Sequence, residues 1–245
     1  MLNKVPDCVF HDICQFLYYT NWNQFMNTTK KFQDINRQTR YLALNNQKSI
    51  LYYESDDFRK IINSKIINPN NQLSLNLRKY NFDNNNINDI FNIHKLDLYF
   101  SNINNNNLNY FRSIKKLNLT GCMCIYDLAP LKMIQEINLS YCYYIKDLSP
   151  LKKAIKVILS ECKILENISD LKDVKIIFLS NCPKITDFTP LKNANILYIT
   201  NCQGKFDAKD LYTVDQLYIH SCYNVNNIHK LKEKKNNNLS IYFYQ

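Results

Sequence analysis

A twenty-residue unit first appears as Ile114-Lys-Lys-Leu117-Asn-Leu119-Thr-Gly-Cys122-Met-Cys-Ile125-Tyr-Asp127-Leu128-Ala-Pro130-Leu131, and its pattern returns from Ile134 to Leu151. The unit then recurs as far as residue 233, and its cysteine keeps the same interval, at Cys122, Cys142, Cys162, Cys182, Cys202 and Cys222. A fixed period in the twenties is typical of a solenoid, in which each repeat buries its apolar face against its neighbours. Such arrays present a long open surface, so this one favours binding over catalysis.

Inside each unit, the local pattern predicts one short strand. Leu117 and Leu119 alternate with polar residues at the period of two that a strand requires. The residues that return the chain to the next strand are too few for a full helix, and Pro130, Pro150 and Pro190 discourage one. We therefore expect extended or 3₁₀ segments on the convex side.

The unit resembles the leucine-rich-repeat family, whose pattern is L-x-x-L-x-L-x-x-N/C-x-L, in a cysteine-bearing form. Further strands are predicted by looser matches at the two ends of the array: Leu75, Leu77, Leu96, Leu98, Leu239, Ile241 and Phe243. The resemblance implies an α/β solenoid, a leucine-rich-repeat array over residues 73–245 with short parallel strands and a 3₁₀ or extended convex side.

Two columns of repeated polar side chains have structural explanations. The thiols advance one per repeat instead of converging on one point, as metal ligands must, so we expect neither a metal nor another cofactor. In the family that the unit resembles, the residue at the cysteine position points inward and bonds to neighbouring backbone, a role that suits a small buried thiol. The aspartates at 127, 147, 187 and 207 precede a short turn, where they would cap free backbone N–H groups.

One residue per repeat lies between the strand leucines and faces the concave side, because side chains alternate along a strand. This column changes from polar to apolar along the chain: Asn76, Asp97, Asn118, Asn138, Ile158, Phe178, Tyr198 and Tyr218. Exposed apolar and aromatic surface is typical of recognition. The candidate substrate-binding residues are therefore Ile158, Phe178, Tyr198 and Tyr218 with Ile176, Ile196 and His220 of the neighbouring columns. The alternative is that the aromatic residues pair across strands only to stabilise the sheet.

Residues 1–45 lack the twenty-residue period, and their apolar residues recur at helical spacing. Pro6 and Asp7 suit a helix start, and a later helix is expected to carry Leu42 and Leu44. The segment can be aligned without gaps to two consecutive consensus patterns, L-P-x-E-I-x-x-x-I-x-x-x-L and then L-x-x-L-x-x-V-C-R-x-W. Nine residues occupy proline or apolar positions of these patterns: Val5, Pro6, Val9, Ile13, Phe16, Leu17, Trp22, Phe25 and Phe32. This segment resembles the F-box, although Cys8 stands where the family has an acidic residue.

The resemblance implies that residues 1–45 bind the adaptor Skp1 through these nine side chains and recruit a cullin-based ubiquitin ligase. Residues 46–72 would form a helical connector, and the concave face of residues 73–245 would bind an unidentified protein substrate. The chain would then be a non-catalytic substrate-recognition subunit of a Skp1–cullin–F-box ligase. The alternative is a leucine-rich-repeat interaction scaffold without a ligase, in which the N-terminal helices cap the first repeat.

Composition excludes several other classes. The chain has a net charge of +10, but its lysines are scattered over every repeat, which does not favour nucleic-acid binding. Its two glycines exclude Gly-rich phosphate loops, and its four histidines lack a nucleophile or carboxylate at a fixed spacing, so we expect no enzyme. Neither a signal peptide nor a membrane span is predicted, which favours the cytoplasm or the nucleus. Abundant Asn and Lys resemble the usage of AT-rich genomes, such as those of large DNA viruses and some amoebae.

Overall fold

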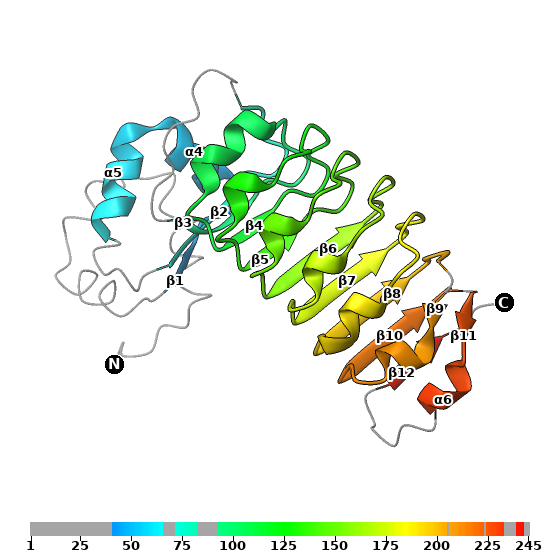
Figure 1. The fold of residues 1–245 in the computed structure, drawn as a ribbon. Coiled ribbons are helices and arrows are strands. Elements are labelled where there is room, and N and C mark those ends of the chain that lie inside the picture. The colour runs from blue at the N-terminus through cyan, green and yellow to red at the C-terminus, as the bar shows by residue number, and fades with distance from the viewer. Residues whose placement is uncertain are drawn as a thin grey trace, which may run out of the picture.

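The computed structural model describes residues 41–65, 72–82, 93–204, 206–222, 224–232 and 239–242. Ten strands of this part form one parallel sheet in chain order, apart from β9 and β11. They are β1 (Tyr41–Ala43), β2 (Gln72–Asn76), β3 (Ile93–Asp97), β4 (Lys116–Asn118), β5 (Glu136–Asn138), β6 (Lys156–Ser160), β7 (Ile176–Ser180), β8 (Ile196–Thr200), β10 (Gln216–His220) and β12 (Leu239–Tyr242). Figure 1 shows the strands stacked in a row, with short helical turns along one side. The predicted leucine-rich-repeat α/β solenoid is confirmed.

Short 3₁₀ helices return the chain between strands. They are η1 (Asn105–Phe111), η2 (Ala129–Leu131), η3 (Ser149–Leu151), η4 (Ser169–Leu171), η5 (Thr189–Asn193) and η6 (Ala208–Leu211). The three repeat prolines lie in the first turn of η2, η3 and η5, where a missing N–H costs nothing. Near the C-terminal end, β9 (Phe206–Asp207) pairs with β11 (Val225–Asn226), and α6 (Ile228–Lys232) follows.

The core lies between the sheet and the 3₁₀ helices, and one repeat shows its composition. Leu139, Cys142, Ile145, Leu148 and Leu151 are each at most 1% exposed. Full burial of a leucine or isoleucine side chain contributes about 1.5–3 kcal/mol. Because the same positions recur in every rung, each repeat is stabilised chiefly by the repeats on either side of it.

At the N-terminal end, helices α4 (Asn46–Glu54) and α5 (Asp56–Lys65) precede β2, within the segment where a helical connector is expected. Asn45 caps α4 by accepting the N–H of Lys48. The buried hydroxyl of Ser49 donates to the Leu44 carbonyl and accepts the N–H of Asn76, which ties α4 to the C-terminal end of β2. Tyr52 and Tyr53 of α4 are buried and extend the core past the first rung.

One sequence prediction for this end is wrong. Leu42 and Leu44 were expected on a helix, but Leu42 lies in β1, which pairs in parallel with β2, and Leu44 follows that strand. The two leucines alternate with a period of two, and pairing with a strand thirty residues further along decides their conformation. The nine residues expected to bind Skp1, from Val5 to Phe32, lie outside the described residues, so that prediction stays a prediction.

Candidate functional site

The six repeated thiols lie inside the solenoid, where each occupies the same position at the end of a strand. All six are at most 1% exposed. The Cys122 Sγ donates to the Leu98 carbonyl at 3.3 Å, and the Cys142 Sγ donates to the Leu119 carbonyl at 3.2 Å. Ser101 takes the same place one rung earlier and donates to the Leu77 carbonyl at 2.8 Å. Each of these carbonyls also accepts a backbone N–H of its own rung, from Tyr80, Ser101 or Cys122, so the inward thiol or hydroxyl is a second donor that links one rung to the next.

Burial also sets the chemistry of these thiols. It raises the pKa of Cys122 and of Cys202 to about 12, and it raises the pKa of Cys142 and Cys222 as well. These four thiols stay protonated at neutral pH, and it is the thiolate that acts as a nucleophile or a metal ligand. Within the described ranges, no group of three or more His, Cys, Asp or Glu side chains is placed to hold a metal ion. No helix in those ranges is long and apolar enough to cross a bilayer.

The aspartate column caps the 3₁₀ turns. Asp127, Asp147 and Asp187 each accept the backbone N–H two residues further on, at 2.8, 2.8 and 2.9 Å. Asn167 and Asp207 make the same contact in their rungs. These carboxylates therefore stabilise turns on the outer side of the solenoid, apart from the concave face.

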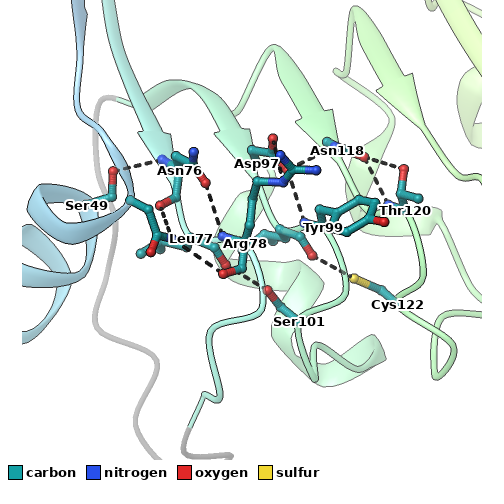
Figure 2. A network of polar contacts seen from close by, with 12 residues as sticks. Ser49, Asn76, Leu77, Arg78, Asp97, Tyr99, Ser101, Asn118, Thr120 and Cys122 are labelled. Carbon is teal, nitrogen blue, oxygen red and sulfur yellow. Dashed lines mark hydrogen bonds and ion pairs between the residues drawn. The ribbon is translucent and has the colours of Figure 1, made fainter.

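The polar half of the concave column forms side-chain turns of its own. Asn76, Asp97, Asn118 and Asn138 each accept the N–H two residues on, at 3.0–3.3 Å, and part of this network is drawn in Figure 2. Each of these N–H groups is thereby taken out of the sheet, and strands β2 to β5 all end at the Asn or Asp itself.

In the apolar half of the column, the strands continue past the concave residue for the same reason. Ile158, Phe178, Tyr198 and Tyr218 offer no acceptor for the N–H two residues on, and pairing of β6, β7, β8 and β10 continues two residues further. The identity of one concave residue per rung therefore sets where the strand ends, at that residue when it is Asn or Asp and two residues later when it is apolar or aromatic.

Three aromatic rings form a stack across the concave face of β7, β8 and β10. The ring centroids of Phe178 and Tyr198 are 4.4 Å apart with an interplanar angle of 8°, and those of Tyr198 and Tyr218 are 4.1 Å apart at 2°. The ring faces of Tyr198 are thus both occupied, so the stack presents ring edges and hydroxyls to a partner. Burial and the neighbouring Tyr218 hydroxyl raise the pKa of Tyr198, which keeps that hydroxyl protonated at neutral pH.

Ile176 and Ile196 are half-buried beside the stack and pair with each other across β7 and β8. His220 lies in the next column of β10, with its Nδ1 3.0 Å from the Ser221 hydroxyl. The structure thus brings all seven candidate substrate-binding residues to one face of β6, β7, β8 and β10. Whether they bind a substrate stays a prediction.

Next to the stack, the concave face holds a hollow of about 340 Å³ that the sequence analysis did not identify. Its charged lining comes from Lys95, Lys116, Glu136 and Lys156 on four successive strands, and His94 lies at its margin. The Nζ of Lys116 is 2.7 Å from the Glu136 carboxylate. The Nζ of Lys156 lies 5.3 Å from the Phe178 ring centroid, so a cation–π contact joins the hollow to the stack.

A second group of aromatic side chains escaped the sequence analysis. Tyr99 and Phe100 follow β3, and Tyr141 and Tyr143 follow β5, with ring centroids between 4.6 and 6.4 Å apart in successive pairs. The Arg78 guanidinium lies 4.3 Å from the Tyr99 ring centroid. Tyr99, Phe100 and Tyr141 lie just before the inward Ser or Cys of their repeats, and Tyr143 lies just after it. The repeat pattern leaves the residue type open at these positions, so no periodic signal marks them.

Comparison with known proteins gives similarity at the level of structure. Internalin C2 from Listeria monocytogenes has a TM-score of 0.55 and 18% sequence identity over 70% of this chain and 80% of its own. Internalin InlF from the same species has a TM-score of 0.46 and 17% identity over 70% of this chain and 68% of its own. The functional domain of InlJ, described as including a cysteine ladder, has a TM-score of 0.39 and 14% identity over 61% and 44%. No protein-family model and no curated protein sequence matches the chain.

The fold and the comparisons agree on one class. The chain is a leucine-rich-repeat solenoid with a cysteine at the inward position that ends each central strand.

Proposed function

We propose that this protein is a leucine-rich-repeat interaction scaffold that binds a protein partner on the concave face of its sheet. The observation that carries the proposal is the stack of Phe178, Tyr198 and Tyr218 beside a charged hollow on that face. Aromatic residues with a polar tip are enriched in protein interfaces, because they bury a large apolar area while the hydroxyl keeps a hydrogen-bond partner.

The geometry of the stack favours a protein over a single-stranded nucleic acid. Proteins that bind single strands use exposed ring faces as platforms for bases. In this stack the rings cover one another, with interplanar angles of 8° and 2°, and only the two outer faces remain. One of those outer faces, on Phe178, carries the ammonium group of Lys156. Ring edges with hydroxyls suit apolar side chains and backbone groups of a polypeptide.

Site-specific photo-crosslinking tests the proposal. A benzophenone amino acid is placed at Thr200, beside the stack, or at Lys172, which is exposed at the end of η4 on the convex side. We expect crosslinked partner proteins from position 200 and not from position 172, and we expect Tyr198→Asp to abolish them. Equal crosslinking from both positions, or products that persist in Tyr198→Asp, would refute concave-face binding.

We further propose that residues 1–45 make the scaffold a substrate receptor of a Skp1–cullin ligase. Support comes from two observations: the F-box pattern from Val5 to Phe32, and the presence of a helix at the N-terminal end of the core. Because α4 already supplies Tyr52 and Tyr53 there, the segment before β1 is not required as the only cover of the first rung.

A binding assay with purified Skp1 tests the ligase proposal separately. We expect the wild-type chain to bind Skp1 and a Pro6→Ala/Leu17→Asp double variant to lose binding. Phe178→Ala serves as the control, because it alters the concave face and should leave Skp1 binding unchanged. Absence of binding by the wild-type chain would exclude the ligase role and leave the interaction scaffold standing.

A further inference from the structure

The hollow and the aromatic stack form one continuous surface. Ile158 and Lys156 line the hollow and lie on β6, and in the sheet register Ile158 pairs with Phe178 and Lys156 with Ile176 on β7. The Lys156 ammonium group reaches the Phe178 ring. A partner that occupies one part is therefore in contact with the other.

The two parts differ sharply in charge. Three lysines and one glutamate line the hollow, Lys95, Lys116, Lys156 and Glu136, which leaves two net positive charges. Glu136 is engaged by Lys116, and no ion pair joins Lys95 or Lys156 to a carboxylate among the described residues. Burial and the nearby Lys116 lower the pKa of His94, so its imidazole is neutral at pH 7. The hollow is thus a cationic recess with two ammonium groups available to an anion.

The part of this surface that the aromatic stack forms carries no such charge. Phe178, Tyr198 and Tyr218 are half-buried, and Ile176 and Ile196 flank the first two. This strip can bury an apolar side chain, but it offers no compensation for a charged one.

From this arrangement we infer that the concave face binds an extended segment of its partner in which a carboxylate side chain enters the hollow and an apolar or aromatic side chain covers the stack. The inference rests on the proposed concave-face binding and adds the chemistry of the bound segment. Lys156 and Tyr198 are two strands apart, and Lys156 and Tyr218 are three apart. At ~4.8 Å per strand these separations are roughly 10–14 Å, which an extended chain at ~3.3 Å per residue spans in about three to four residues.

Phage display on the full chain tests the inference. A library of random dodecapeptides is selected against the wild-type protein, and the enriched peptides are synthesised and their affinity is measured by fluorescence anisotropy. We expect an enriched pattern with Asp or Glu three to four residues from Phe, Tyr, Trp, Leu or Ile. The Lys95→Glu/Lys156→Glu variant should lose at least tenfold in affinity, and a peptide with Lys in place of its acidic residue should recover part of that loss.

The matched control is Lys152→Glu/Lys172→Glu, which makes the same charge change at exposed positions of the convex side. It should change affinity less than threefold, because interactions over such distances are screened by salt. Tyr198→Ala should weaken the same peptides tenfold or more.

The other outcomes would exclude the acidic segment, concave-face binding, or both. Peptides that lack an acidic residue, are weakened by Tyr198→Ala and are indifferent to Lys95→Glu/Lys156→Glu would overturn this inference and leave concave-face binding intact. If no enriched peptide is weakened by either concave variant, both the inference and the proposed function fail. If the wild-type chain binds an oligo-dT strand with a steep salt dependence that the lysine variant removes, the hollow is a phosphate site and the inference is wrong.

Discussion

The chain contains two glycines, and their surroundings predict very different costs for the same substitution to alanine. Gly204 is buried, and a Cβ there would lie 2.4 Å from the Ile185 carbonyl oxygen and 2.9 Å from the Thr186 Cα. Both are backbone atoms of the preceding repeat, so they can move only if that repeat shifts. Overpacking of this kind costs about 1–3 kcal/mol, and we expect Gly204→Ala to lie near the upper limit.

Gly121 has a φ of +74°, and a Cβ there would lie 2.7 Å from the ring of Phe100. That ring is 42% exposed and can rotate away. The equivalent position in other repeats is held by Tyr141, Glu161 and Asn181, all with positive φ. The turn itself thus accepts a side chain at a cost of roughly 1 kcal/mol, which is what we expect for Gly121→Ala.

Thermal unfolding followed by circular dichroism measures both costs against the wild type. For a chain of this size, about 1 kcal/mol shifts Tm by about 2–4 °C, so Gly204→Ala should lower Tm by roughly 6–12 °C and Gly121→Ala by roughly 2–4 °C. In a Phe100→Ala background, Gly121→Ala should retain only the backbone cost. A loss for Gly121→Ala equal to or above that for Gly204→Ala would refute the assignment of the larger cost to a backbone contact.

Three further predictions concern the repeats. In a Cys8→Ser/Cys14→Ser background, only the exposed Cys124 should react with a chromogenic disulfide reagent. Fast labelling of more than one thiol in the folded protein would contradict the burial of the six repeated thiols. Burial raises the pKa of Cys122 and Cys202 from 9.0 to about 12, so the unfolded chain loses these protons at a lower pH than the folded chain does. The free energy of unfolding should therefore fall as the pH rises from 9 to 12. The fall should be up to about 1.4 kcal/mol per pH unit for each thiol. The urea midpoint at pH 8, 9 and 10 in reductant measures this fall; Cys202→Ser should flatten it, and an unchanged slope would argue against it. Asp147→Ala should cost about 0.5–2 kcal/mol in urea unfolding because the Ser149 N–H loses its acceptor, whereas Asp147→Asn should cost less; equal losses would show that the cap is not the cause.

Much of the fold could be derived from the repeat alone. The interval between cysteines, the paired strand leucines and the closing leucine recur in register, so one correctly assigned repeat assigns the others. The concave column from Asn76 to Tyr218 followed from the alternation of side chains along a strand. The structure adds that the same column sets where each strand ends, because an Asn or Asp in it captures an N–H that an Ile, Phe or Tyr leaves to the sheet.

The errors and omissions fall where the repeat gives no information. Leu42 lies before the array, and its strand exists because β2 is available to pair with it. The hollow was missed because the column of Lys95, Lys116, Glu136 and Lys156 mixes charges and carries no fixed residue type. The aromatic group around Phe100 was missed because its members come from three different positions after the strands, and other repeats fill the position of Phe100 and Tyr141 with Glu, Asn or Ser.

The sequence by itself determined the solenoid, the inward thiols and the face on which Phe178, Tyr198 and Tyr218 lie, because a repeat that stacks on copies of itself leaves one arrangement for each of its positions. Only the tertiary structure decided that the three rings stack in parallel, that Lys116 engages Glu136, and that Lys95 and Lys156 remain available beside an apolar strip. These features depend on the directions of long side chains on neighbouring strands, which spacing along the chain does not specify.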